Sequence, residues 1–218
     1  MPRKKWAAPL IGVIAAACGD AVGIRTANDV TVSPQTVGIA AVEGVQVTRV
    51  RVVVGAVKLE TAGVDGTVDF LSEQSFVVEA ALSGGQATVP VTLGAPAGTY
   101  KEVEVSIDKL EPGKESEAAA LLAHPGLAEA SIAIRVSVLE NGVPNVFTFT
   151  AALDRDMEIK HDPFLVIPAG GSAVTVITLD TTGWFLDALG TLLDPRDPAN
   201  RSVIEANIQA SFAAAVAP

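Results

Sequence analysis

The ten residues KEVEVSIDKL, at positions 101–110, decide the fold class because apolar and polar side chains alternate strictly from Glu102 to Asp108. Successive side chains of an extended strand point to opposite faces of a sheet. Val103, Val105 and Ile107 therefore share one face, while charged and hydroxyl side chains occupy the other. The pattern predicts a strand with one buried and one solvated face, which is typical of antiparallel sheets.

Similar runs of β-branched residues recur along the chain, separated by glycine, proline and asparagine. The longest run, 45–60, changes the phase of its apolar positions beside Gly55, which predicts a β-bulge. The segment ENGVPN at 140–145 separates two strong runs and predicts a hairpin loop. Pro90 lies within an alternating run and predicts an edge strand, because proline cannot donate a backbone hydrogen bond. The other strands are expected at 67–70, 75–82, 87–93, 131–139, 146–153, 157–160 and 173–180.

Three segments depart from the strand pattern. Residues 115–123 are rich in alanine and leucine and predict a short helix over one end of the sheet, which ends at the HPG sequence of 124–126. Apolar residues between 184 and 189 also have helical spacing. Beyond them, Asn200 or Ser202 is expected to cap a C-terminal helix. Its apolar residues recur every four positions and are expected to face the core: Ile204, Ile208 and Phe212.

Together these elements predict an all-β protein, an antiparallel β-sandwich with one or two short helices that include the C-terminal one. The sandwich domain is expected to occupy residues 37–218, a length of roughly 180 residues that can bury a core without disulfides. A PAG turn precedes a strand at 96–98 and again at 168–170. This repeat reflects either an internal duplication or shared turn chemistry.

The N-terminus carries an export pattern, with basic residues at 3–5, an apolar segment at 6–17 and small residues directly before Cys18. The apolar segment is shorter than the roughly 20 residues that a transmembrane helix needs. The pattern resembles a bacterial lipoprotein signal peptide at 1–17, which implies that Cys18 becomes lipidated. The small and polar residues of 18–36 then form a flexible tether.

Cys18 is the only cysteine of the chain, so an intrachain disulfide is impossible. Acylation would remove a reactive thiol from an exported protein, whereas the alternative is a buried or fortuitous cysteine after an ordinary cleavable signal. In the lipoprotein interpretation, glycine rather than aspartate at position 19 implies sorting to the outer membrane of a bacterial cell envelope.

The charge balance argues against several classes of partner. The chain has 15 basic and 25 acidic residues, and loss of the three basic residues at 3–5 moves its net charge from −10 to about −13. Such a surface repels phosphates, so the composition predicts no basic face and no nucleic-acid partner. An acidic excess is typical of solvated surfaces and, less often, of sites that bind a divalent cation or a cationic ligand.

The segment DRDMEIKHDP at 154–163 is the best candidate for a metal site, because acidic side chains at alternate positions can converge on calcium. Its candidate ligands are Asp154, Asp156 and Glu158. Arg155 and Lys160 can neutralise the same run, so a solvated strand edge is the other interpretation. No other cofactor is expected.

The sequence offers no recognisable catalytic group. Its two histidines, His124 and His161, lie outside any nucleophile–base motif and are expected to be solvated. Trp184 and Tyr100 are the large polar-tipped rings that a glycan would use, but their contexts favour core packing.

Two further patterns carry a resemblance to a known class of proteins. LGAPAGTY at 93–100 leads into an alternating strand, and the tail combines Trp184-Phe185, Asp194-Pro195 and IEANIQASF at 204–212. Both are similar to bacterial envelope lipoproteins that have a β-sandwich domain of unknown function. The resemblance implies a lipid-anchored β-sandwich and brings no catalytic residues with it.

The sequence thus predicts a non-enzymatic envelope lipoprotein that acts as a binding or surface-structural module. Its expected partners are the membrane, through the lipid at Cys18, and an envelope protein or glycan. Two alternatives stay open: a calcium- or glycan-binding module, and a hydrolase whose site follows no familiar motif.

A Cys18→Ala substitution tests the anchor. We expect the variant to lose incorporation of a labelled fatty acid and to be released from the membrane fraction, because acyl chains provide the membrane affinity. Membrane association that is unchanged in the variant would contradict lipidation at this residue.

Overall fold

The computed structural model describes residues 44–63 and 68–214. The strands of this part form one nine-stranded antiparallel sheet, which confirms the all-β prediction. Two separate sheets, as a sandwich implies, are not shown by the strand pairing. The strands are β1 (Val45–Thr61), β2 (Phe70–Ser72), β3 (Phe76–Ser83), β4 (Gln86–Leu93), β5 (Gly98–Ile107), β6 (Ile132–Glu140), β7 (Val143–Ala151), β8 (Arg155–Ile167) and β9 (Ala173–Asp180).

Strand β1 organises the sheet because it pairs with four other strands. Its first half lies between β6 and β3, and its second half lies between β5 and β2. The change of partners coincides with a register shift between Val54 and Ala56, so the predicted bulge at Gly55 is confirmed. A Cβ at Gly55 would lie 2.5 Å from Asp108 Oδ2, which explains why glycine occupies the bulge.

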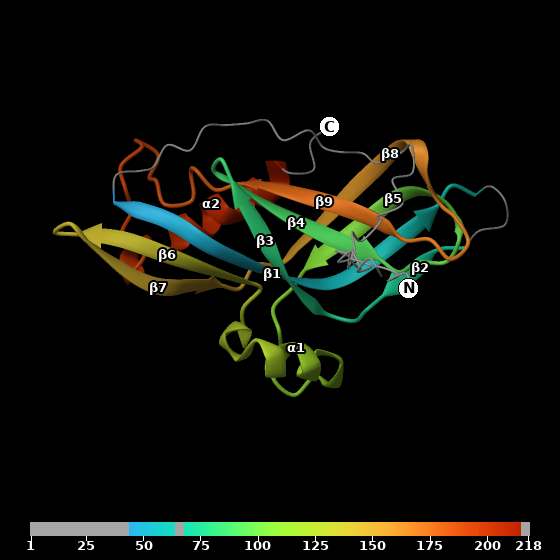
Figure 1. The fold of residues 1–218 in the computed structure, drawn as a ribbon, viewed down its shortest axis with the longest axis horizontal. Helices are drawn as coiled ribbons and strands as arrows, with labels where there is room; N and C mark the ends of the chain where they lie inside the picture. The colour runs from blue at the N-terminus through green and yellow to red at the C-terminus, as the bar shows by residue number, and fades with distance from the viewer. Residues whose placement is uncertain (1–43, 64–67, 215–218) are drawn as a thin grey trace, which may run out of the picture.

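The remaining strands extend the sheet outward from β1 (Figure 1). The two-residue turn Asn141-Gly142 joins β6 to β7, and both of its residues have positive φ, as the hairpin prediction requires. Strand β4 lies between β3 and β9, so the prediction that it is an edge strand is wrong. The pairing with β3 ends at Thr88, however, and Pro90 therefore lies where β4 is paired with β9 alone.

The predicted helix near residue 115 is present as a short 3₁₀ turn, η1 (Glu115–Glu117), followed by α1 (Ala118–Ala123) and η2 (Pro125–Leu127). This excursion covers the middle of the sheet face that is opposite the main core. There Val53 of β1 packs with Leu110, Leu127 and Ala130 in a small second cluster. We call this face of the sheet, on which α1 lies, the outer face.

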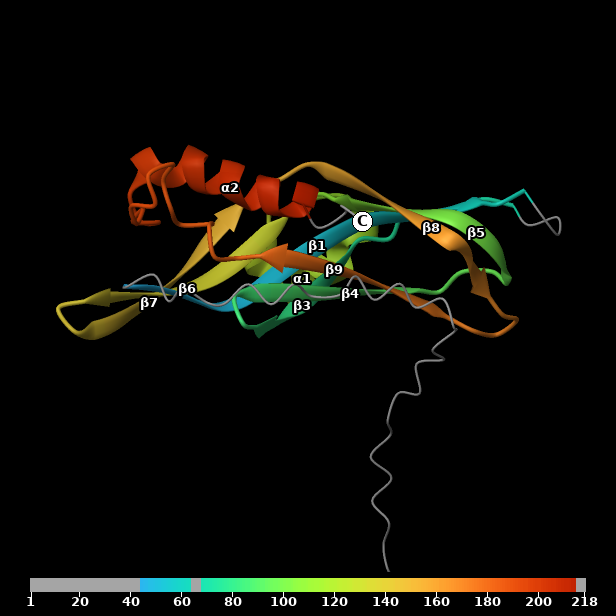
Figure 2. The same cartoon turned by 90° about the horizontal axis from the view of Figure 1, so that it is seen from above.

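The C-terminal helix α2 (Arg201–Ala214) covers the other face of the sheet (Figure 2). Its predicted apolar stripe is confirmed, since Ile204, Ile208 and Phe212 are fully buried in the main core. The 3₁₀ turn η3 (Pro198–Asn200) precedes the helix, and the carboxylate of Asp197 caps that turn by accepting a hydrogen bond from the backbone N–H of Ala199. Of the two predicted caps of α2, Ser202 is wrong because it lies inside the helix, whereas Asn200 lies directly before it and donates its side-chain amide to the carbonyl of Asp194. The segment around Trp184 forms turns rather than a helix, because its apolar side chains fill the core from a loop.

Arg201 ties the start of α2 to strand β7. Its guanidinium donates a hydrogen bond of 2.5 Å to the carbonyl of Thr150 and lies 5.2 Å from the centre of the Phe149 ring. Phe149 in turn meets Phe185 edge to face, with ring centres 6.3 Å apart. The Phe149–Phe185 contact, with Arg201 over the Phe149 ring, therefore joins α2, β7 and the loop that carries Phe185.

The two PAG turns serve strands in different surroundings. Gly98 begins β5, which lies between β1 and β8, whereas 168–170 precedes β9, which pairs with β4. Shared turn chemistry is sufficient to explain the repeat, and an internal duplication stays a prediction.

Several predictions concern residues outside the described part of the chain: the signal peptide 1–17, Cys18 and the tether 18–36. They stay predictions. Among the described residues, no helix has the length and apolar character needed to cross a membrane.

Glu117 is a buried acidic residue that holds the excursion containing α1 in place. Its side chain is 1% exposed; it accepts hydrogen bonds from the Glu111 N–H at 2.5 Å and from Ser75 Oγ at 3.4 Å, and pairs with Lys114 Nζ at 2.6 Å. Burial acts to raise the pKa of Glu117, but the hydrogen bonds from Lys114 and Glu111 outweigh it and the pKa lies below its ordinary value.

We expect Glu117→Ala to lower the free energy of unfolding by about 2 kcal/mol, because it leaves buried donors without an acceptor. Chemical denaturation at neutral pH measures this loss, and Glu115→Ala, an exposed residue of the same turn, is the matched control. Since folding depresses the Glu117 pKa, its stabilisation is present above the unfolded pKa and is lost as the pH falls through the folded one. Equal stability losses in the two variants would contradict this role.

Candidate functional site

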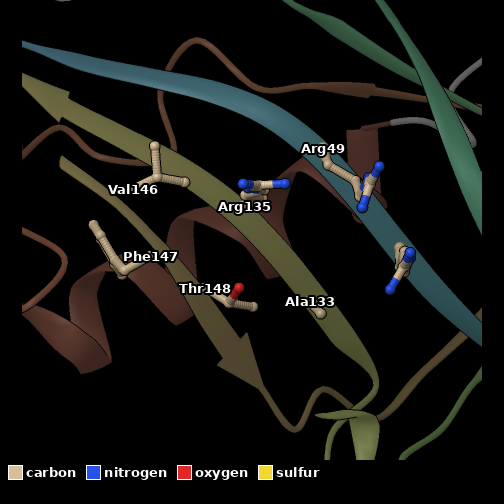
Figure 3. Close-up of a pocket in the computed structure, with 7 residues that line it drawn as sticks. Arg49, Ala133, Arg135, Val146, Phe147 and Thr148 are labelled. Carbon is tan, nitrogen blue, oxygen red and sulfur yellow. The ribbon is translucent and has the colours of Figure 1, made fainter. Parts of the chain in front are cut away.

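Three arginines gather on the outer face of strands β1 and β6, beside β7 (Figure 3). Arg49 and Arg51 alternate with the buried Val50 and Val52 of β1, so they project away from the main core. Arg135 of β6 lies directly opposite Arg49 in the strand register. The arginines line a shallow cavity of about 300 Å³, which we call the basic hollow, together with Ala133, Val146, Phe147 and Thr148.

The basic hollow has more positive than negative charge. Arg49 and Arg51 share a single carboxylate, that of Glu79 on β3, at 3.2 and 3.1 Å. Within the described chain, the guanidinium of Arg135 forms no ion pair. One glutamate against three arginines leaves two positive charges without compensation, and like charges directly opposite each other across strands are destabilising.

The surroundings of the arginines favour a ligand that bears anionic groups. A guanidinium presents paired N–H donors that match the two oxygens of a carboxylate or a phosphate. Thr148 adds a hydroxyl, and Val146, which is 46% exposed, adds an apolar border. The ring of Phe147 packs toward the main core, away from the arginines, so it provides no stacking platform (Figure 3).

The hollow contradicts the prediction, made from net charge, that the chain has no basic face. Composition averages over the surface, whereas the hollow depends on where Arg135 lies. The alternation around Arg49 and Arg51 already placed them on a solvated face. Only the pairing of β1 with β6, which are far apart in sequence, brings Arg135 beside them.

The candidate calcium ligands lie at the other end of the sheet. Asp156 and Glu158 are exposed on one face of β8, and Asp154 precedes the strand. Burial and then the nearby carboxylates of Glu104, Asp108 and Asp154 raise the pKa of Asp156. Across the described residues, no group of three or more histidine, cysteine, aspartate or glutamate side chains is placed to hold a metal ion. Calcium binding gains no support from the geometry and stays a prediction.

The two histidines do not assemble a catalytic site among the described residues. His161 is 6% exposed on the core side of β8, so the prediction that it is solvated is wrong. Neither of its ring nitrogens has a hydrogen-bond partner. His124 is partly buried at the end of α1. Neither histidine is held by a described side chain as a catalytic base, and the hydrolase interpretation stays a prediction.

Both candidate sugar-binding rings are buried. Trp184 donates a hydrogen bond from Nε1 to Ser211 Oγ at 3.0 Å, and the Tyr100 hydroxyl donates to the carbonyl of Pro96 at 2.9 Å. Each ring is at most 1% exposed, which confirms the prediction of core packing. A glycan platform made of these two rings is excluded.

No protein-family model, curated protein or solved structure matches this chain. The candidate site therefore rests on the geometry and charge of its own residues.

The buried His161 makes a prediction about stability at acidic pH. Burial lowers the pKa of His161, so the unfolded chain takes up its proton first as the pH falls. Stability therefore declines from near pH 6.5 downward, by at most about 1.4 kcal/mol per pH unit for this one proton.

We expect His161→Phe to flatten that decline, as measured by denaturant unfolding at a series of pH values between about 7 and 5. The other histidine provides the control, since His124→Gln also removes one imidazole. An unchanged slope in the His161 variant would contradict a buried, neutral imidazole.

Proposed function

We propose that this chain is a non-enzymatic envelope lipoprotein that acts as a binding module, and that its basic hollow binds an anionic partner. One observation carries the proposal. A chain with a net charge of −10 collects three arginines around one cavity and provides a single carboxylate to neutralise them. The like-charge pair Arg49–Arg135 costs stability in the free protein, and an anion that bridges the two would relieve it.

The same balance of charges limits the class of partner. Two uncompensated arginine charges suit a small number of carboxylate, sulfate or phosphate groups held in one place. A long polyanion would also meet the acidic remainder of the surface and be repelled by it. We therefore propose a compact anionic group rather than a nucleic acid.

The scaffold and the anchor are part of the proposal. The finer description of the fold as a β-sandwich is supported by a single core cluster that the inner sides of β1, β4, β5, β6 and β9 share. Lipidation at Cys18 and a tether at 18–36 would hold this domain at the bacterial outer membrane, as the export pattern of the sequence implies.

Titration with hexaglutamate, a soluble polycarboxylate, tests the hollow. In the full-length chain carrying Cys18→Ala, we expect saturable binding by calorimetry that weakens as salt is added. Arg135→Ala should weaken it about five- to tenfold, since one charge-assisted contact contributes roughly 1–1.4 kcal/mol here.

Lys160→Ala is the matched control, because it removes one positive charge from an exposed position on β8, outside the hollow. We expect its affinity to stay within about twofold of the parent. If both variants bind hexaglutamate equally well, or the parent does not bind it, the hollow is not an anion site.

A further inference from the structure

A second charged surface lies toward the opposite end of β1. On β5 the buried residues Val103, Val105 and Ile107 face the core, so the glutamates between them face outward. The same alternation on β8 turns its acidic residues outward around the buried Met157. We call the four residues Glu102, Glu104, Asp156 and Glu158 the acidic strip.

The acidic strip carries an excess of negative charge that mirrors the excess in the basic hollow. Glu104 and Glu158 are directly opposite each other in the β5–β8 register. Lys58 reaches Glu104 at 3.1 Å, and Lys160 lies opposite Glu102, so two positive charges stand among the four carboxylates. Two negative charges are left over. Burial, and after it the nearby carboxylates of Glu104, Asp108 and Asp154, raise the pKa of Asp156.

The basic hollow and the acidic strip lie on the same face of the sheet, at different places along β1. Strand β6 pairs with β1 up to Val52, and β5 pairs with it from Val54 onward. The basic hollow and the acidic strip therefore lie on opposite sides of the excursion that contains α1 (Figure 1). Within one chain they are separated along β1 and cannot neutralise each other by contact.

We propose that the anionic partner of the basic hollow is the acidic strip of a second copy of this chain. This inference rests on the proposed function and names its partner. Each surface holds a like-charge pair that is unfavourable in the isolated chain, Arg49–Arg135 in one and Glu104–Glu158 in the other. Contact between two copies brings the opposite excesses together and removes both penalties at once.

Rigid strands favour this partner over a flexible acidic peptide. Carboxylates fixed on β5 and β8 lose little conformational freedom on binding, whereas a peptide must be ordered first. Every copy carries both surfaces, so the contact is heterologous and can continue from one copy to the next. Lipid anchoring would confine the copies to one membrane plane and raise their local concentration.

Sedimentation velocity of the full-length chain with Cys18→Ala tests the association. At low ionic strength, about 20 mM, we expect the sedimentation coefficient to rise with protein concentration, and at about 500 mM salt we expect that rise to be lost. A chain that sediments as a monomer at both salt concentrations, up to the highest attainable protein concentration, overturns the proposal.

Charge reversal identifies the surfaces that meet. Arg135→Glu destroys the hollow and keeps the strip, and Glu158→Lys does the opposite; we expect each variant alone to associate at least about tenfold more weakly. Mixing the two variants should restore association, because an intact strip then meets an intact hollow. Glu115→Lys, which makes the same charge change at an exposed position outside both surfaces, should behave like the parent.

The outcomes separate this inference from the function on which it rests. Failure of the mixture to associate, or equal loss in the Glu115 control, overturns self-association. If hexaglutamate still binds in an Arg135-dependent way, the hollow remains an anion site for another partner. If the copies still associate but Arg135→Glu leaves that association unchanged, the association does not use the hollow and the proposal is overturned as well.

Discussion

Pairing of β1 with four strands is the constraint on which the rest of the structure depends. A single strand of this length must change neighbours, because β6 and β5 cannot occupy the same stretch of one edge. The bulge at Gly55 makes that change possible, and the close approach of Asp108 leaves no space there for a side chain. Since the bulge restores the alternation beyond it, Val57 and Leu59 return to the same core as Val52 and Val54. One core then continues along the full length of β1.

The same constraint divides the charges of the outer face. The α1 excursion buries Val53 at the centre of that face, and Glu117 secures the excursion by satisfying the N–H of Glu111. The basic hollow and the acidic strip lie on either side of this excursion, where β6–β7 and β5–β8 carry opposite excesses of charge. Repulsion between like charges at the surface is weakened only to the extent that solvent and salt screen it. Partly exposed arginines and glutamates placed opposite their own kind are therefore costly features of the free chain.

Local sequence patterns were sufficient for most of the strands, because period-two alternation, the Asn141-Gly142 turn and the Gly55 phase shift each act over a few residues. The patterns were insufficient wherever partners distant in sequence decide the outcome. Pro90 correctly indicated missing pairing, but β3 leaves β4 only partway along. Trp184 and its neighbours have helical spacing, yet they fill the core from a loop anchored by Ser211 on α2. His161 is polar in sequence and buried in space, because the alternation of β8 places it on the core side.

The candidate site was harder to predict from the sequence than the strands were, because it also depends on partners that are distant in sequence. Net charge predicted a surface without basic character, and that average is correct for the chain as a whole. Recognition, however, is local: an electrostatic contact acts over about one Debye length, roughly 8–10 Å, so a few residues outweigh the rest of the surface within that range. Arg135 acquires its significance only when β6 aligns it with Arg49, just as Glu158 does when β8 aligns it with Glu104. A chain can thus be acidic overall and still present, on one face, the two complementary surfaces that self-recognition requires.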